Sequence, residues 1–244
     1  LLLVEELLNL TMNKLAVIIL AAGKGTRMGN IGIPKCLLRI GDASIIEYQV
    51  EFLKKVGIHD ILVITGHQAE KIESVLKNKV KFRHQLPKTD NLYAVWEARE
   101  ILHDDFICIF ADLVFHPEIL NQCYRSKSDI CLMVEPNTRE DTMKVKTEDG
   151  KVIAVSDDIP TDQANGNFIG MAKFSKSLAK ILFNEISVLV RENNTDAYYT
   201  LAIEKMIEQG IKIGYSTTNN FPWFNINDQN EFKKSEKHCS KHRQ

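Results

Sequence analysis

The sequence lacks an apolar run of the roughly 20 residues that a bilayer-spanning helix requires. It also has almost no net charge, because 31 Lys and Arg residues oppose 32 Asp and Glu residues. Binding to nucleic acid or to an acidic membrane surface needs a basic face, so we expect neither as a partner. Its five cysteines form no CxxC pair, and an odd number makes a poor disulfide framework. Cys108 and Cys131 lie within apolar runs, which indicates buried thiols of a cytoplasmic protein.

The 244 residues suffice for one α/β domain with a full core, which we place at residues 12–237. Residues 1–11 are apolar but contain two glutamates and no basic stretch, which is not typical of a signal peptide. We treat them as an N-terminal extension of unassigned function. Near the other end, His238, Cys239 and His242 have no fourth metal ligand nearby, so a solvated tail is the better interpretation.

Strand-like and helix-like segments alternate along the first half of the chain. Short β-branched runs predict buried parallel strands, and amphipathic segments between them predict helices. This alternation requires right-handed crossovers and an open, doubly wound α/β sheet. The predicted strands are 15–20, 60–65, 80–84, 105–113 and 129–135, and the predicted helices are 44–57, 68–77, 91–102 and 116–124.

From about residue 140 the pattern changes. Asp149 and Gly150 lie between two alternating runs, which predicts a β-hairpin. We therefore expect a Rossmann-like mixed sheet with a hairpin lid and a ligand-binding insertion. The other predicted elements are strands at 168–174 and 211–216 and helices at 175–193, 196–209 and 227–237.

The loop after the first predicted strand, LAAGKGTRMGNIGIPKCLL at residues 20–38, holds four glycines and three cations. In an open α/β sheet, ligands bind beyond the carboxyl ends of the strands, where this loop begins. Gly23 and Gly25 allow backbone N–H groups to approach a ligand, and such groups bind phosphate oxygens. The loop therefore predicts a phosphate site.

Three interpretations of this loop compete with one another and with a plain surface turn. A P-loop needs a lysine directly after its last glycine, and the dinucleotide fingerprint needs glycine where Met28 stands. Neither requirement is met. Three cations, Lys24, Arg27 and Lys35, instead suit a nucleoside triphosphate with about four negative charges. A glycine-rich surface turn with solvated cations is the weaker alternative.

The string LAAGKGTRMG followed by PKCLL resembles the signature of the sugar-phosphate nucleotidyltransferase superfamily. The similarity continues through IIEYQVEFLKKVGI, DILVITGH, IFADLVF and PWFNINDQNEF, from residue 14 to about 235. It implies that an acceptor phosphate attacks the α-phosphorus of a bound nucleoside triphosphate and that pyrophosphate leaves. It assigns catalytic roles to Arg27, at the β- and γ-phosphates, and to Lys35, at the α-phosphate. The implied nucleotide-binding loop is Leu20, Ala21, Ala22, Gly23, Lys24, Gly25, Thr26 and Arg27, with Lys35.

The resemblance also implies a Mg²⁺ site. Asp112, at the end of IFAD, falls where the superfamily has a metal-binding aspartate, and carboxylate oxygen suits Mg²⁺. The second superfamily ligand falls at Asn227, where a carboxylate is commoner, and Asn225 lies two residues earlier. TDNLYAVWEA resembles the segment that reads base and ribose in cytidylyltransferases, which brings Thr89, Asp90 and Asn91 to the nucleotide. Asn91 also suits a helix N-cap.

Within the superfamily, length and spacing look most like the short CTP-dependent cytidylyltransferases acting on phosphocholine, aminoethylphosphonate, inositol phosphate or phosphoglutamine. That likeness implies CTP and a small phosphorylated acceptor as partners, a role in capsule or cell-surface biosynthesis, a nucleotide half at 14–135 and an acceptor half at 140–228. It leaves a homodimer open. Acceptor candidates are Lys144, Asp196 and Tyr198. Two positions depart from many relatives, with Asp157 in place of lysine and Asn167 in place of glutamate.

Several alternatives stay open at this point. A sugar-1-phosphate uridylyl- or thymidylyltransferase and a molybdopterin nucleotidyltransferase share the loop signature. A nucleotide-binding regulator with a decayed metal site would explain Asn225 and Asn227. An aromatic cage for a quaternary ammonium is a further option, although aromatics at helical spacing are more often core. Its candidates are Tyr93, Trp96, Tyr198, Tyr199, Phe221, Trp223 and Phe224.

Overall fold

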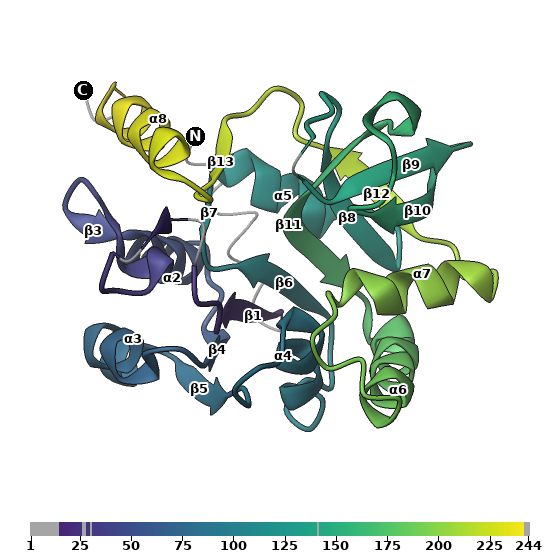
Figure 1. Ribbon diagram of the computed structural model, residues 1–244, viewed down its shortest axis with the longest axis horizontal. Coiled ribbons are helices and arrows are strands. Elements are labelled where there is room, and N and C mark those ends of the chain that lie inside the picture. The colour runs from purple at the N-terminus through teal and green to yellow at the C-terminus, as the bar shows by residue number, and fades with distance from the viewer. Residues whose placement is uncertain (1–14, 26–27, 30, 141, 242–244) are drawn as a thin grey trace.

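A parallel sheet forms the first half of the computed structural model, which describes residues 15–25, 28–29, 31–140 and 142–241 (Figure 1). Strand β1 (Ala16–Ala21) pairs in parallel with β4 (Asp60–Thr65) on one side and with β6 (Phe106–Phe110) on the other. β4 also pairs with β5 (Lys81–His84). All residues of β1 are buried, as its unbroken apolar run predicts.

One antiparallel strand, β11 (Gly166–Phe174), joins the two halves. It pairs with β6 and with β8 (Ile130–Glu135), and β8 pairs in parallel with β12 (Gly214–Thr217). The hairpin of β9 (Lys144–Glu148) and β10 (Lys151–Ser156) adds to the first residues of β11. Its turn is formed by Asp149 and Gly150 at positive φ, as the DG pair predicts. The mixed, doubly wound sheet and the hairpin are confirmed.

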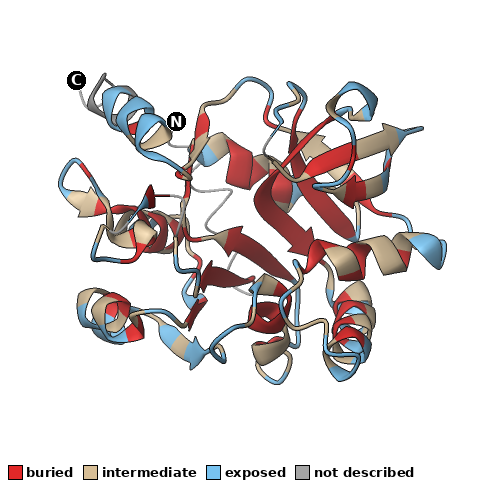
Figure 2. Cartoon of the chain, viewed as in Figure 1, coloured by how far each residue is buried: buried red, intermediate tan, exposed pale blue. Residues whose placement is uncertain are grey.

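Helices cover both faces of this sheet, and strand residues alternate between two cores. Val17 and Ile19 pack into the core under α2 (Ile45–Lys55), α3 (Ala69–Leu76) and α5 (Pro117–Arg125). Ile18 packs into the core under α4 (Asn91–Glu97), α6 (Lys176–Arg191) and α7 (Thr200–Glu208). In Figure 1, α2 and α3 lie to the left of the strands and α6 and α7 to the right; Figure 2 shows the buried strands between them.

Two small sheets flank the main one. β7 (Leu113–Phe115) pairs antiparallel with β13 (Trp223–Asn225), and β2 (Arg39–Ile40) pairs with β3 (Ala43–Ser44). The last helix, α8 (Gln229–Lys241), follows β13. Short 3₁₀ turns occur at Lys35–Leu37, Lys77–Lys79 and Thr161–Gln163.

Several element boundaries predicted from the sequence are wrong, among them the start of β12, which was expected at residue 211 and lies at Gly214. The strand expected at 105–113 is split, because the chain leaves the main sheet at Ala111 and Asp112 before β7 begins. The helix expected at 91–102 ends at Glu97 and continues as turns. The helix expected at 196–209 begins only at Thr200, because the preceding segment bonds to the start of α4.

Candidate active site

An open cleft with a volume of about 1270 Å³ lies at the carboxyl ends of β1 and β6 and extends to the second half of the molecule. It collects all the described residues that the sequence assigned to the site. Thr26 and Arg27 fall outside the described residues, so their predicted roles remain predictions. The collected residues are Leu20, Ala21, Ala22, Gly23, Lys24, Gly25, Lys35, Thr89, Asp90, Asn91, Asp112, Lys144, Asp196, Tyr198 and Asn227.

Gly25 and Gly23 differ in what requires glycine there. Gly25 has a φ of +64°, and a Cβ on it would lie 2.6 Å from Cγ of Lys35. A side chain would therefore strain the backbone and displace Lys35. A Cβ on Gly23 would meet nothing within 4 Å, although this residue lines the cleft. The space beside Gly23 is therefore available to a ligand.

Lys35 and Asp112 form an ion pair across the cleft. The Lys35 Nζ lies 2.6 Å from Oδ2 of Asp112, and the two side chains are only 14% and 19% exposed. Lys35 opens a 3₁₀ turn directly after Pro34, and Asp112 follows β6. The two residues that the sequence assigned to the α-phosphate and to the metal thus lie in direct contact.

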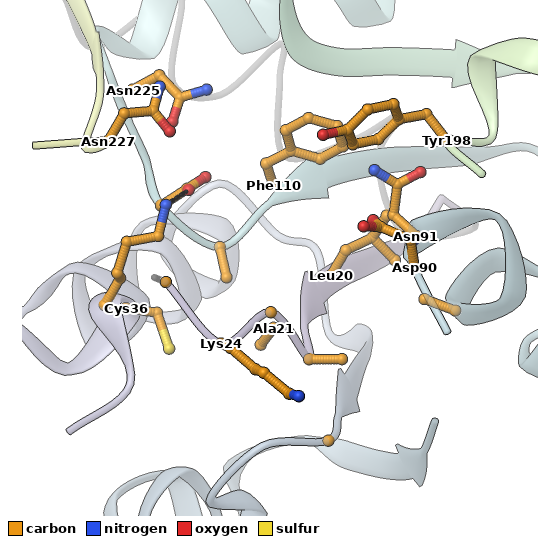
Figure 3. Close-up of a pocket in the computed structure, with 18 of the residues that line it drawn as sticks. Leu20, Ala21, Lys24, Cys36, Asp90, Asn91, Phe110, Tyr198, Asn225 and Asn227 are labelled. Atoms are coloured by element: carbon orange, nitrogen blue, oxygen red, sulfur yellow. Dashed lines mark hydrogen bonds and ion pairs between the residues drawn. The ribbon is translucent and has the colours of Figure 1, made fainter. Parts of the chain in front are cut away.

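Asn225 and Asn227 lie beside this pair. The backbone N–H of Ile226 donates to the Asp112 carbonyl at 3.0 Å, which brings the end of β13 to the tip of β6. The side-chain oxygen of Asn225 is buried and has no hydrogen-bond partner among the described residues. The Asn227 backbone N–H donates to the Glu231 carboxylate at 2.9 Å. Figure 3 shows the two asparagine side chains next to one another.

This donor set fits a magnesium ion that takes part of its shell from phosphates. The orphaned Asn225 oxygen and the Asp112 carboxylate are oxygen donors of the kind that Mg²⁺ prefers, and Mg²⁺ often uses one or two carboxylates plus substrate phosphates. Across the part of the chain that the structure describes, no cluster of three His, Cys, Asp or Glu residues could hold a metal by itself. The predicted Asn227 ligand remains a prediction, and Asn225 joins it as a candidate.

At the other end of the cleft, Asp90 begins α4 as its N-cap. Its carboxylate accepts from the Asn91 backbone N–H at 2.6 Å, so the prediction of Asn91 as N-cap is wrong by one residue. The Asn91 side-chain oxygen instead accepts from the Tyr199 backbone N–H at 2.7 Å. Desolvation, with a smaller contribution from the Asp196 carboxylate, raises the pKa of Asp90. Figure 3 shows Asp90, Asn91 and Tyr198 close together and away from Asn225 and Asn227.

The acceptor candidates line the opposite wall. Lys144 is only 6% exposed, and its Nζ donates to the Asp157 backbone carbonyl at 3.0 Å. Asp196 and Tyr198 are exposed. Asn167 is fully buried, and its side-chain oxygen accepts from the Arg139 backbone N–H and the Thr142 hydroxyl. The Asn167 side chain thus fixes the main chain beside this wall, whereas Asp157 contributes only its backbone carbonyl.

The aromatic cage finds little support. Of its seven candidates, Tyr198 and Trp223 line the cleft. Tyr199 is fully buried between Phe110, Phe168 and Phe174, and Trp96 packs against Tyr93 with the two rings tilted by 37°. These aromatics are core, as helical spacing favours.

Sequence reasoning missed several residues of the cleft. Gln68 and Gln85 line it with buried side-chain oxygens that have no partner among the described residues. Arg139 also lines it and lies over the Trp223 ring. No motif marks these residues. The sequence marks Arg139 only as a single cation between two predicted strands, which does not indicate a binding site.

A glycine-rich loop, a lysine–aspartate pair and a cleft of about 1270 Å³ lie together at one sheet edge, as expected of a nucleotide-using transferase. Residues 17–198 match the sequence family of the MobA-like NTP transferase domain, and the chain belongs to this family. It is a nucleotidyltransferase, within the sugar-phosphate nucleotidyltransferase superfamily that the loop signature indicated.

Individual relatives refine this picture. The chain is 25% identical to the CTP:phosphoglutamine cytidylyltransferase of Campylobacter jejuni over 79% of its own length and 88% of that protein. It is 34% identical to the choline-phosphate cytidylyltransferase of Streptococcus pneumoniae over 45% of this chain and 50% of that protein. It is 25% identical to the bifunctional protein GlmU of Thermoanaerobacter pseudethanolicus over 93% of this chain and 52% of that protein. It thus aligns with about half the length of the latter two.

The fold is shared with solved nucleotidyltransferases. The CTP:phosphocholine cytidylyltransferase structure from Streptococcus pneumoniae matches with a TM-score of 0.76 at 21% identity, covering 92% of this chain and 99% of that one. A similarity this distant establishes the fold alone. None of the helices among the described residues has the length and apolar character needed to cross a membrane.

Proposed function

We propose that this nucleotidyltransferase transfers CMP from CTP to a phosphorylated small molecule and releases pyrophosphate. One observation carries the proposal: the loop of residues 20–25, the Lys35–Asp112 pair and the Asp90–Asn91 helix start line one cleft. These are the segments whose sequence resembles cytidylyltransferases. The similarity to a CTP:phosphoglutamine cytidylyltransferase along most of both chains supports CTP.

The chemistry is a displacement at phosphorus. An oxygen of the acceptor phosphate forms a bond to the α-phosphorus, the bond from that phosphorus to the bridging oxygen breaks, and the electron pair leaves with pyrophosphate. The chain mainly positions the reactants and neutralises charge. Backbone N–H groups of the loop bind the phosphates, Lys24 lies near them, and Lys35 stabilises the charge that develops on the α-phosphate.

Nucleotidyltransferases of this family generally use a divalent metal ion. In this chain Asp112, with Asn225 and Asn227, would hold it, and it would neutralise phosphate charge there. Asn225 and Asn227 reduce the charge of the site, which would suit a decayed regulator. The short Lys35–Asp112 pair, retained in the cleft, argues for an active enzyme.

The acceptor belongs, in this proposal, to the class of phosphocholine, aminoethylphosphonate and phosphoglutamine, used to decorate a cell-surface glycan or lipid. Asp196 and Tyr198 would contact its head group. A sugar 1-phosphate is the second candidate, because the chain aligns with GlmU over almost its whole length.

A pyrophosphate-release screen tests the proposal. Purified protein with Mg²⁺ receives ATP, CTP, GTP or UTP together with phosphocholine, 2-aminoethylphosphonate, phosphoglutamine, inositol 1-phosphate, glucose 1-phosphate or N-acetylglucosamine 1-phosphate. We expect CTP to exceed each other nucleotide by at least about tenfold in kcat/KM, about 1.4 kcal/mol of discrimination. A preference for UTP with a sugar 1-phosphate would contradict it. Tight CTP binding without turnover for all acceptors would favour the regulator.

A further inference from the structure

Trp223 forms a fixed platform at the acceptor side of the cleft. Its indole N–H donates to the buried Glu135 carboxylate at 2.9 Å, and the Thr218 hydroxyl donates to the same oxygen at 2.8 Å. The indole residue is only 7% exposed, although it lines the cleft. Its ring is therefore held in one orientation by a charge-assisted hydrogen bond.

The guanidinium of Arg139 lies over this ring. Its Cζ is 4.7 Å from the ring centroid, and the side chain is 47% exposed in the cleft. Among the described residues it pairs with the Glu231 carboxylate, whose Oε1 lies 3.8 Å from Nη1, at the outer limit of an ion pair. Stacking on an aromatic face leaves the edge of a guanidinium, with its N–H donors, available for hydrogen bonds.

The main chain around Arg139 is also fixed. The fully buried Asn167 accepts from the Arg139 backbone N–H at 3.0 Å and donates to the Asn137 carbonyl. Glu135 accepts from both N–H groups of Asn137, main chain and side chain. These hydrogen bonds fix the main chain from Asn137 to Arg139, which lowers the entropic cost of ordering this loop around a ligand.

An acceptor phosphate needs a cation of its own. Among the described residues of the acceptor wall, the cations are Lys144 and Arg139. Lys144 is nearly buried, and its ammonium group already donates to the Asp157 carbonyl. We propose that Arg139, stacked on Trp223, binds the phosphate of the acceptor by donating two parallel N–H···O hydrogen bonds to its oxygens. This assigns to Arg139 the role that the sequence suggested for Lys144, and it rests on the proposed transfer to a phosphorylated acceptor but not on CTP.

Glu231 also lines this site. Its carboxylate faces Arg139 through one oxygen, and its other oxygen accepts from the Asn227 backbone N–H. A phosphate that binds Arg139 competes with Glu231 for the guanidinium.

The test uses inorganic phosphate and phosphocholine as probes, so that it does not depend on knowing the acceptor. Trp96 and Trp223 are the two tryptophans, and Trp96→Phe leaves Trp223 as the reporter. Fluorescence titrations are run with saturating CTP and a chelator, which fills the nucleotide phosphate site and prevents turnover. We expect a saturable response that Arg139→Ala weakens roughly tenfold or more, while the CTP dissociation constant changes less than about twofold. Arg139→Lys should fall between the two.

Arg99→Ala is the matched control, made in the background that retains Trp96, with calorimetry as readout. Arg99 also stacks on a tryptophan, with its Cζ 3.4 Å from the Trp96 centroid, but neither residue lines the cleft. It should leave phosphate binding unchanged. A response of equal strength in wild type and Arg139→Ala, or none in wild type, would overturn the proposal. A nucleotide preference other than CTP would overturn the proposed function and leave this result standing.

Discussion

Lys35 and Asp112 show how a contact changes the meaning of two residues that the sequence treats separately. The motif places a lysine at the α-phosphate and an aspartate at the metal, and spacing alone does not say that the two side chains meet. They do, at 2.6 Å. In the proposed reaction, a nucleotide with its metal competes with this ion pair, and we expect each residue to contribute to binding as well as to the reaction.

We expect Lys35→Ala to lower kcat about 10²–10³-fold, or roughly 3–4 kcal/mol, because its charge acts where charge develops in the transition state. Thermal unfolding should shift less than the rate does, because Lys35 lines the cleft and is not part of the apolar core. Steady-state kinetics with CTP and melting curves check both statements. Lys81→Ala is the control: it breaks an exposed 2.8 Å pair with Asp60 and should change neither measurement appreciably. Near-normal turnover in Lys35→Ala would show that the motif has been misassigned.

Residues of the site differ in how well the sequence predicts them. Gly25 and Lys35 belong to a contiguous motif, so their proximity follows from local geometry, and the structure adds the 2.6 Å approach that makes glycine necessary. Asn91 illustrates the opposite case. Its side chain bonds to Tyr199, a residue 108 positions away, and local propensity favoured an N-cap instead. Arg139 likewise depends on Trp223 and Asn167, which no pattern connects to it.

At the scale of elements, the buried strands and amphipathic helices of the first half are predicted in type and order, and some, such as β4 at Asp60–Thr65, to the residue. Apolar periodicity reports burial, and these elements are buried in a regular way. The position of β11 between β6 and β8 was not predicted, because an antiparallel insertion depends on pairing between distant segments. The short β7 and β13 were missed for the same reason.

Glu135 connects several of these elements at the end of β8. Burial by itself would raise its pKa, but hydrogen bonds from Trp223, Thr218 and Asn137 outweigh that effect and lower the pKa below the usual glutamate value. A pKa lowered in the folded state stabilises the protein above the unfolded value of about 4.3. This contribution is lost as the pH falls through the lower, folded pKa.

We therefore expect Glu135→Gln to be less stable than wild type at pH 7 by about 1–3 kcal/mol, because it removes charge-assisted hydrogen bonds from buried donors. The difference between the two proteins should shrink as the pH falls below the unfolded value of about 4.3, because wild type loses its advantage on protonation. Chemical denaturation at a series of pH values measures it. A difference that stays constant with pH would mean that the Glu135 charge does not contribute.

At the scale of the whole molecule, the nucleotide half and the acceptor half meet along the cleft, and one seam joins them there. The backbone N–H groups of Asp90 and Leu92 donate to the carbonyls of Thr195 and Ala197, and the Asn91 side chain accepts from Tyr199. The proposed base-reading segment and the proposed acceptor-reading segment are thus one hydrogen-bonded unit. The single domain at residues 12–237 and its division into two halves stay predictions.

This seam makes two variants behave differently. Lys144→Ala lies away from the seam, on the acceptor wall, and should raise the acceptor KM with little change in the CTP dissociation constant, because its ammonium group bonds within the acceptor half. Asn91→Ala leaves the N–H of the buried Tyr199 without its acceptor, at a cost of about 1–3 kcal/mol. The released segment carries Asp196 and Tyr198, and the start of α4 carries Asp90 as its N-cap. We therefore expect the CTP dissociation constant and the acceptor KM both to rise, by roughly fivefold or more.

Calorimetry with CTP and kinetics with the acceptor separate the effects. Equal losses of both affinities in Lys144→Ala, or a loss confined to CTP in Asn91→Ala, would show that the cleft is not divided and joined in this way.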